Sequence, residues 1–155
     1  MKKDLLSLLD LEKEDFETLF TRAIQLKERY ARGIFDKLLA GKSLGLIFDK
    51  KSTRTRVAFE TAMIQLGGHP IYMSTQDTRI SRNEPARDTA RVLSRYVDCL
   101  AMRTFDHSLV EEFAQNATIP VINALTDSFH PCQILSDIMT IIEHKGGYKN
   151  IKIAW

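Results

Sequence analysis

The sequence predicts an α/β fold with three layers, in which a four-stranded parallel sheet lies between helices. Four short apolar segments have strand length, at residues 43–49, 69–73, 97–102 and 119–123. The segments that separate or follow them carry apolar residues at helical spacing instead. Because parallel strands are joined by right-handed crossover helices, this alternation indicates a parallel sheet covered on both faces. We expect the strand order 2-1-3-4.

The first long helix is predicted over residues 12–30, where apolar side chains form one stripe. Gly33 loosens this helix, and Gly41 precedes the first strand. The strand itself, residues 43–49, is short and apolar, as a buried strand should be. The apolar stripe of the helix consists of Phe16, Leu19, Phe20, Ile24 and Leu26.

The second helix begins after Ser52 or Thr53, either of which can cap it. The glycines at 67–68 end this helix. A second strand follows at 69–73. The polar segment 74–85 then predicts a long exposed loop, and loops of this length in compact domains are often functional. The apolar residues of the second helix are Val57, Phe59, Met63, Ile64 and Leu66.

The middle of the chain repeats the alternation of helix and strand. Pro85 suits the start of a helix over residues 86–96, which leads to the third strand at 97–102. A short helix at about 108–115 then leads to the fourth strand at 119–123.

The last predicted helix begins at Pro131, after a loop at 124–129, and ends at the glycines 146–147. Residues 1–150 therefore form one predicted domain. The alternation in 151–155 resembles the opening of a strand, and we expect it to begin a second domain; a terminal edge strand or an unstructured tail is the alternative. The apolar residues of the last helix are Ile134, Leu135, Ile138, Ile141 and Ile142.

Composition excludes several classes of protein. The net charge is +2 with 27% charged residues, which does not indicate a polyanion binder. Cys99 and Cys132 lie in apolar contexts without metal-ligand spacing, so buried thiols in a reducing compartment are expected. The apolar patch at 5–9 is followed at once by acidic residues, and no apolar run is long enough to span a membrane. We expect a cytoplasmic protein with no membrane or nucleic-acid partner.

Polar side chains gather where the first strand gives way to the second helix. Hydroxyl groups of Ser52 and Thr53, free N–H groups of the helix start and the guanidinium of Arg54 together favour an anion, and phosphate is a natural ligand. In the alternative interpretation, Ser52 only caps the helix and the arginines are solvated. Arg56 and Glu60 have the spacing of an ion pair, so Arg56 has a structural alternative of its own.

Two further segments follow neighbouring strands and should meet this one at the carboxyl edge of the sheet. Arg103 follows the third strand, and His130 and Gln133 follow the fourth at the start of the last helix. Such a site suits a phosphorylated small molecule held with millimolar to micromolar affinity. The positive helix end should lower the pKa of His130, so that neutral imidazole can polarise a carbonyl oxygen. A purely structural histidine is the alternative.

Other charged residues give weaker signals. One helix face carries three arginines, Arg87, Arg91 and Arg95, and such a row of arginines also occurs in nucleic-acid binders. The interleaved Asp88 favours a solvated or ion-paired face instead. No glycine-rich phosphate loop occurs. Three histidines stand at element edges without partners at ligand spacing and are expected to be surface groups: His69, His107 and His144.

With these motifs, the sequence resembles the aspartate/ornithine carbamoyltransferase family. Residues 52–60 read STRTRVAFE and are similar to the family's carbamoyl-phosphate signature, S-T-R-T-R-x-x-F-E. Four other segments are similar to the ornithine branch in particular: 5–11, 88–96, 102–104 and 129–133. The resemblance spans nearly all of the chain, but only the amino-terminal, carbamoyl-phosphate domain of such an enzyme.

The resemblance implies a reaction in which the δ-amine of ornithine attacks the carbonyl carbon of carbamoyl phosphate, giving citrulline and phosphate in arginine metabolism. It implies no metal and no organic cofactor. The physics agrees, because phosphate leaves best when its charge is neutralised and when donors meet the developing oxyanion. By the same resemblance, the phosphate is held by Ser52, Thr53, Arg54 and Thr55.

The remaining implied roles concern the carbamoyl group. Arg103, His130 and Thr55 would polarise its carbonyl oxygen, and Gln133 would contact its amide. In the loop at 74–85 the family commonly has Gln where this chain has Arg79. That position reaches the site of a neighbouring subunit in the family's trimer, so a homotrimer is expected and Arg79 is a candidate phosphate ligand.

The ornithine-binding half of the family, with its catalytic cysteine motif, would lie beyond Trp155. Cys132 is not that cysteine. We therefore expect this chain alone to bind carbamoyl phosphate without turnover. Two alternatives stay open: a carbamoyltransferase for another amine, such as putrescine, and a non-catalytic phosphoanion-binding module.

Overall fold

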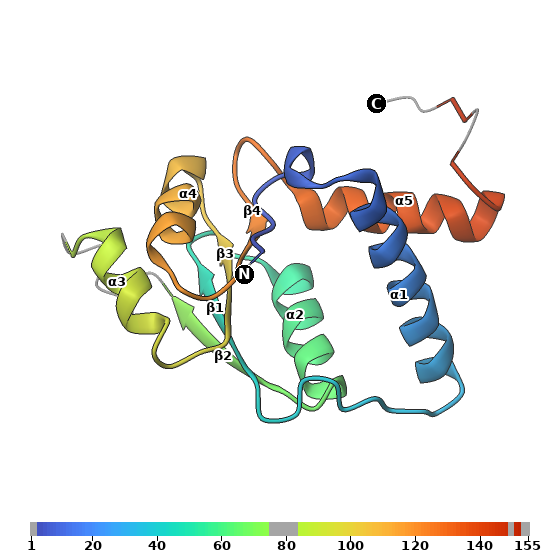
Figure 1. Cartoon of the computed structure of the whole chain (residues 1–155), viewed down its shortest axis with the longest axis horizontal. Helices are drawn as coiled ribbons and strands as arrows, with labels where there is room; N and C mark the ends of the chain where they lie inside the picture. The colour runs from blue at the N-terminus through green and yellow to red at the C-terminus, as the bar shows by residue number, and fades with distance from the viewer. Residues whose placement is uncertain (1–2, 75–83, 149–150, 153–155) are drawn as a thin grey trace.

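A single sheet of four parallel strands runs through the centre of the chain, in a computed structural model that describes residues 3–74, 84–148 and 151–152. The strands are β1 (Ser43–Phe48), β2 (His69–Ser74), β3 (Cys99–Arg103) and β4 (Val121–Leu125). Their spatial order is β2-β1-β3-β4, and every neighbouring pair is parallel (Figure 1). The predicted fold class and strand order are therefore confirmed.

Helices cover both faces of this sheet. Figure 1 shows α3 and α4 on one side and α2, α1 and α5 on the other. This places the starts of α2 and α5 on the same side of the sheet, which matters for the site described below. The helices are η1 (Leu8–Asp10, a 3₁₀ turn), α1 (Lys13–Ala31), α2 (Thr53–Gln65), α3 (Ala86–Leu93), α4 (His107–Asn116) and α5 (Pro131–Lys145).

Each face of the sheet has its own hydrophobic core, because successive side chains of a strand point to opposite faces. On one face Leu100 and Met102 of β3 pack with Phe113 of α4, and all three are fully buried. On the other face Leu46 of β1 packs with Met63 of α2. The two cores hold the carboxyl ends of the strands in fixed positions.

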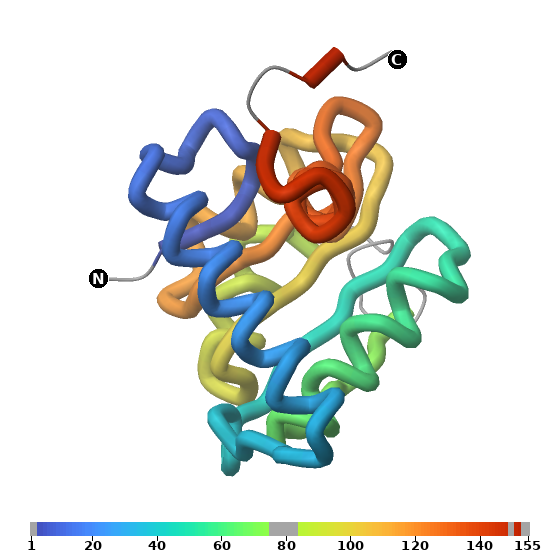
Figure 2. Tube along the Cα trace, turned by 90° about the vertical axis from the view of Figure 1, so that its right-hand side faces the viewer, coloured from blue at the N-terminus to red at the C-terminus, as the bar shows by residue number. Residues whose placement is uncertain are grey.

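The amino-terminal segment pairs with the outer edge of β4, a feature that the sequence did not predict. Leu5 N–H donates to the Val121 carbonyl (2.9 Å), and Asn123 N–H donates to the Leu5 carbonyl (2.8 Å). Leu5 thereby forms a parallel bridge with Ile122. Figure 2 shows this blue segment running beside the orange β4. The outer edge of β4 is thus paired with the amino-terminal segment and is not left open.

Several predicted boundaries were wrong by one to three residues; the third strand, for example, was expected at 97–102, whereas β3 is Cys99–Arg103. The fourth strand was expected at 119–123, but β4 begins at Val121, because Pro120 has no N–H to give to a ladder and only its carbonyl pairs, with Leu100 N–H at 3.0 Å. The third helix was expected to reach residue 96, but α3 ends at Leu93. The chain then turns toward β3.

Several predictions fall outside the described residues. They include most of the loop at 74–85, with Arg79, and most of the segment 151–155. Ile151 and Lys152 are described and are not part of a strand. None of the described helices combines the length and apolar character that a membrane crossing demands.

Candidate anion-binding site

The start of α2 presents free backbone donors. Ser52 is the N-cap residue, in extended conformation, and its Oγ accepts a hydrogen bond from Thr55 N–H at 3.3 Å. The first turn of α2 contains no acidic side chain. The partial positive charge of this helix end is therefore not neutralised from within the helix. The predicted cap at Ser52 is confirmed.

Arg103 ties this helix start to the end of β3. Its Nη1 donates to Thr55 Oγ1 at 3.2 Å, across 48 residues of sequence. The register of β3 against β4 shifts between Met102 and Arg103, so that Arg103 pairs with Leu125. Such an irregularity at a sheet edge commonly redirects a side chain next to a site. The Nε atom of Arg103 is buried and has no hydrogen-bond partner among the described residues.

Positive charges meet here, and the described residues that line the hollow include no carboxylate. Burial lowers the pKa of Arg103, and the nearby charge of Arg54 lowers it further. Arg54 is exposed on the first turn of α2. Two guanidinium groups that destabilise each other would both be stabilised by an anion between them.

His130 is the third contributor, and it stands at the N-cap position of α5. Its pKa is lowered, chiefly by burial and then by the positive charge of Arg103, while Asp137 opposes the shift. The predicted direction is confirmed, although the cause is burial and Arg103 rather than the helix end. The Nδ1 atom of His130 is buried and has no partner within the described part of the chain. The ring is thus held neutral near pH 7.

One hollow of about 410 Å³ unites these groups, a size typical of sites for small molecules. Arg54, Arg103 and His130 all line it, so the three segments that were expected to converge do so. Thr53 lies outside this lining, exposed on the first turn of α2. The lining residues are Ser52, Arg54, Thr55, Ala58, Phe59, Arg103, Leu125, His130, Cys132, Gln133 and Ser136.

Gln133 lines the hollow from the first turn of α5. Its Nε2 donates to Asp137 Oδ1 at 2.9 Å, one turn further along the helix. The side-chain amide is exposed at this position, so the bond to Asp137 can be exchanged for a bond to a ligand at small cost. Gln133 was predicted as a site residue and does line the hollow, with its Nε2 bonded to Asp137.

Arg56 does not face the hollow. Its Nε donates to Glu60 Oε1 at 2.9 Å, and its guanidinium lies 3.6 Å from the centre of the Tyr72 ring. These contacts raise the pKa of Arg56, first through the bond to Glu60. The structural interpretation of Arg56 is the correct one.

Cys132 lines the hollow but is not activated. Its Sγ lies 3.5 Å from the Asn123 carbonyl oxygen, and burial raises the pKa of the thiol to about 11. Burial also raises the pKa of Cys99 to about 11. Both free thiols stay protonated at neutral pH. They were predicted to be buried, and the structure places both residues at intermediate exposure.

Two residues were misjudged or missed from sequence. His107 was expected at the surface, but its side chain is only 15% exposed and its Nδ1 shares a hydrogen bond with Thr126 Oγ1 at 3.1 Å. Lys50 was not singled out, yet it forms an ion pair with Asp127 and lies 4.3 Å from the centre of the Phe105 ring. It ties the loop after β1 to the loop after β4.

The arginines of α3 belong to a different surface. Arg91 donates to Asn116 of α4 at 3.1 Å and lies 3.5 Å from Asp88, as expected for an ion-paired face. Among the described residues, no three His, Cys, Asp or Glu side chains are grouped so that they could hold a metal ion.

Comparison with known proteins agrees with these motifs. Residues 3–143 match the family model described as aspartate/ornithine carbamoyltransferase, carbamoyl-P binding domain. An ornithine carbamoyltransferase of Desulfotalea psychrophila is 57% identical over the whole chain, which covers 51% of that protein. The chain spans about half the length of the curated relatives it matches.

Solved structures agree as well. The ornithine carbamoyltransferase from Pyrococcus furiosus superposes with a TM-score of 0.91 at 51% identity, over 93% of this chain and 46% of that one. An N-acetyl-L-ornithine transcarbamylase gives a TM-score of 0.83 at 31% identity, over 94% of this chain and 48% of that one. On these grounds the chain belongs to the aspartate/ornithine carbamoyltransferase family and matches its carbamoyl-phosphate-binding domain.

Proposed function

We propose that this chain is the carbamoyl-phosphate-binding half of an ornithine carbamoyltransferase, which transfers a carbamoyl group to the δ-amine of ornithine. The observation that carries the proposal is the hydrogen bond from Arg103 to Thr55, because it joins two distant segments at the hollow that Arg54 and His130 also line. Positive charges and hydrogen-bond donors from three segments of the chain surround one small volume. A phosphorylated small molecule with a carbonyl group matches that arrangement.

The phosphate end is assigned to the start of α2. Backbone N–H groups there, with the hydroxyls of Ser52 and Thr55, provide donors, and Arg54 provides a full positive charge. Thr53, which is exposed on the same turn outside the lining, is assigned to the phosphate by the family resemblance alone. Together they neutralise the phosphate, which lowers the energy of the departing group as the C–O bond breaks. Arg79 is a further candidate phosphate ligand, from a neighbouring subunit.

The carbonyl end is assigned to Arg103, His130 and Thr55. When the amine nitrogen attacks the carbonyl carbon, negative charge develops on the carbonyl oxygen, and these donors are already in place to stabilise it. Neutral imidazole serves here because it donates a hydrogen bond without a second positive charge beside Arg103. The amine loses a proton, and phosphate leaves with the electrons of the C–O bond. Gln133 is assigned to the carbamoyl amide.

The identity of the amine that accepts the carbamoyl group depends on the other half of the enzyme. Relatives named for ornithine and for N-acetyl-L-ornithine share this half of the fold, so this half does not by itself determine the acceptor. We assign ornithine because relatives that are 54% and 57% identical to this chain carry that name. The full enzyme is proposed to act in arginine biosynthesis in the cytoplasm, as a homotrimer whose second domain, beginning at about residue 151, binds ornithine.

A carbamoyl-phosphate titration of this chain, followed by calorimetry, tests the proposal. We expect one site with millimolar to micromolar affinity and no release of citrulline from this half alone. The full-length enzyme should form citrulline on addition of ornithine, and preference for putrescine would favour the other acceptor. Absence of carbamoyl-phosphate binding would contradict the proposal. Binding of phosphate with no preference for carbamoyl phosphate would favour a non-catalytic anion-binding module.

A further inference from the structure

We propose that His107 and Thr126 are positioning residues, which hold the turn at 126–129 and thereby fix the imidazole of His130 toward the carbonyl end of the hollow. The inference rests on the proposed function, because it concerns the orientation of a group assigned to the substrate. Neither residue lines the hollow itself. Their role is inferred from the hydrogen bonds that link them to the backbone next to His130.

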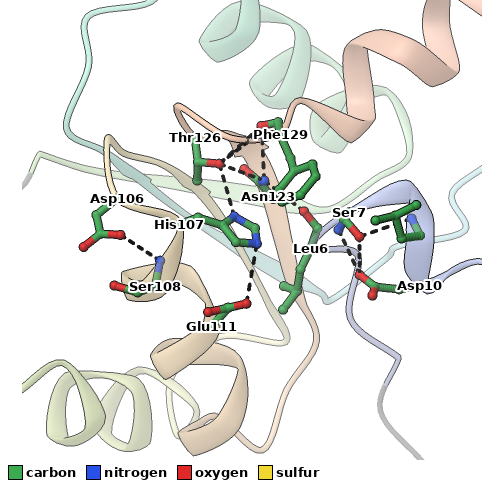
Figure 3. Close-up of polar contacts among 11 residues, drawn as sticks. Leu6, Ser7, Asp10, Asp106, His107, Ser108, Glu111, Asn123, Thr126 and Phe129 are labelled. Carbon is green, nitrogen blue, oxygen red and sulfur yellow. Dashed lines mark hydrogen bonds and ion pairs between the residues drawn. The ribbon is translucent and has the colours of Figure 1, made fainter.

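The turn before His130 is closed by two hydrogen bonds. Thr126 N–H donates to the Phe129 carbonyl at 2.9 Å, and Phe129 N–H donates to Thr126 Oγ1 at 3.2 Å. Thr126 is only 3% exposed, so these bonds are protected from water. Figure 3 shows Thr126 joined by hydrogen bonds both to His107 and to Phe129. The hydroxyl of Thr126 is thus part of the backbone geometry of the turn.

His107 fixes that hydroxyl from α4. Its Nδ1 shares the 3.1 Å hydrogen bond with Thr126 Oγ1, and its Nε2 lies 3.8 Å from Glu111 Oε1 on the next helical turn (Figure 3). Its ring also packs edge-to-face on Phe129, with centroids 4.8 Å apart. The ring is therefore held by one hydrogen bond at Nδ1 and by its packing on Phe129. This lone histidine connects a helix on one side of the sheet to the turn that precedes α5.

Asn123 completes the support from β4. Its Nδ2 donates to the Phe129 carbonyl at 3.3 Å and to the Leu6 carbonyl at 2.9 Å. Asn123 is completely buried, so the amide has no solvent to compete for these bonds. The turn is consequently held from α4, from β4 and from the amino-terminal segment.

His130 needs such support because its own ring is not oriented by a bond at Nδ1. That atom is buried without a partner in the described part of the chain, whereas functional histidines are commonly fixed through their second nitrogen. The direction of the ring then depends on the backbone of His130, which follows Phe129 directly and leads into α5 with φ −136° and ψ 69°. A displacement of about 1 Å in such a group is enough to lose a catalytic contact.

The test compares Thr126→Val, which removes the hydroxyl at nearly constant volume, with Thr126→Ser, which keeps it. Carbamoyl phosphate and inorganic phosphate are titrated separately into each variant of this chain, followed by NMR, and each variant is also melted. We expect Thr126→Val to weaken carbamoyl-phosphate binding about tenfold while phosphate affinity stays within about twofold. Thr126→Ser should restore the carbamoyl-phosphate affinity. A merely structural role would weaken both ligands together.

His107→Gln is titrated and melted in the same way. The glutamine side chain keeps a donor and an acceptor, and this variant tests the positioning role if Thr126→Val does not fold. Equal weakening of both ligands, or unchanged binding of both, would overturn the positioning role. Failure of the proposed function is distinct, because the unaltered chain would then bind no carbamoyl phosphate. Failure of this inference leaves that binding intact in the unaltered chain.

Discussion

At the scale of single residues, the hollow brings together donors and positive charges that the protein does not itself pair. Burial and the nearby charge of Arg54 lower the pKa of Arg103, and Arg103 Nε and His130 Nδ1 lack partners among the residues described. Buried polar atoms without partners destabilise a fold unless they serve another purpose. At this site the purpose we propose is to place the guanidinium of Arg103 and the ring of His130 beside a bound oxyanion.

Arg54→Ala is expected to weaken carbamoyl-phosphate binding by about 2 kcal/mol or more, because a charge-assisted contact to phosphate is lost. Arg56→Ala is the matched control. It also removes an arginine side chain, two residues further along the helix, but Arg56 contacts Glu60 and Tyr72 instead of lining the hollow. It should lower the melting temperature and leave the affinity unchanged. Calorimetry of both variants measures the difference, and equal affinities in the two would remove Arg54 from the site.

The lowered pKa of His130 predicts a pH dependence of stability. In the unfolded chain the imidazole binds a proton below its ordinary pKa of about 6.5, whereas the folded chain resists protonation until lower pH. The unfolded state therefore binds more protons in this interval, and stability should fall as the pH falls below about 6.5. Urea denaturation across this range should show a weaker dependence in His130→Gln. An NMR titration that placed the pKa of His130 above 6.5 would contradict the assignment.

Which residues the sequence could predict depends on local signals. Ser52, Arg54 and His130 stand where strands end and helices begin, so topology alone directs them to one edge of the sheet. His107 has no such signal, because its partner Thr126 lies 19 residues away and a single histidine at a helix start is usually exposed. Only the packing of α4 against β4 brings the two side chains together.

At the scale of elements, the start of α2 serves both the fold and the site. The hydroxyl of Ser52 caps the helix at Thr55 N–H, and the other N–H groups of the first turn have no carbonyl partner within the helix. A cap that fixes the helix start also fixes the position of Thr55, the acceptor of the Arg103 bond.

Ser52→Ala should therefore lower the free energy of unfolding by about 1 kcal/mol, the usual effect of losing an N-cap. It should also weaken carbamoyl-phosphate binding. Ser52→Thr keeps the hydroxyl and should retain most of the stability. Urea denaturation of the two variants measures this difference, and a stability for Ser52→Ala equal to that of the unaltered chain would show that the 3.3 Å bond does not cap the helix.

The elements that sequence reasoning placed least well are those set by distant partners. The position of β4 follows from Pro120, which cannot donate to the ladder, and from Leu5, which pairs on the other side of the strand. Apolar periodicity located the strand within two residues but not its pairing. The bridge at Leu5 joins positions more than a hundred residues apart, for which no local pattern exists.

At the scale of the whole molecule, alternation of strands and helices was sufficient to predict a parallel sheet covered on both faces, and the expected order 2-1-3-4 is the one observed. The site depends on that order, because β1 and β3 are neighbours and β4 lies next to β3. The segments that follow these three strands therefore lie side by side. The core between the sheet and α3 and α4 maintains this arrangement.

Phe113→Ala is expected to lower the free energy of unfolding by about 3–5 kcal/mol, because Phe113 is completely buried between α4 and the sheet. Leu9→Ala is the control, since Leu9 is 85% exposed and its truncation should change stability by less than about 0.5 kcal/mol. Chemical denaturation of both variants makes the comparison. Similar losses in the two would mean that this core does not stabilise the sheet as described.

The central claim is that three separate segments form one carbamoyl-phosphate site, and an NMR titration of the chain with carbamoyl phosphate tests it most directly. We expect the amide signals of Thr55, Arg103 and Gln133 and the ring signals of His130 to shift together with one dissociation constant. Signals that move with different constants, or shifts confined to one segment while the others stay unchanged, would contradict it.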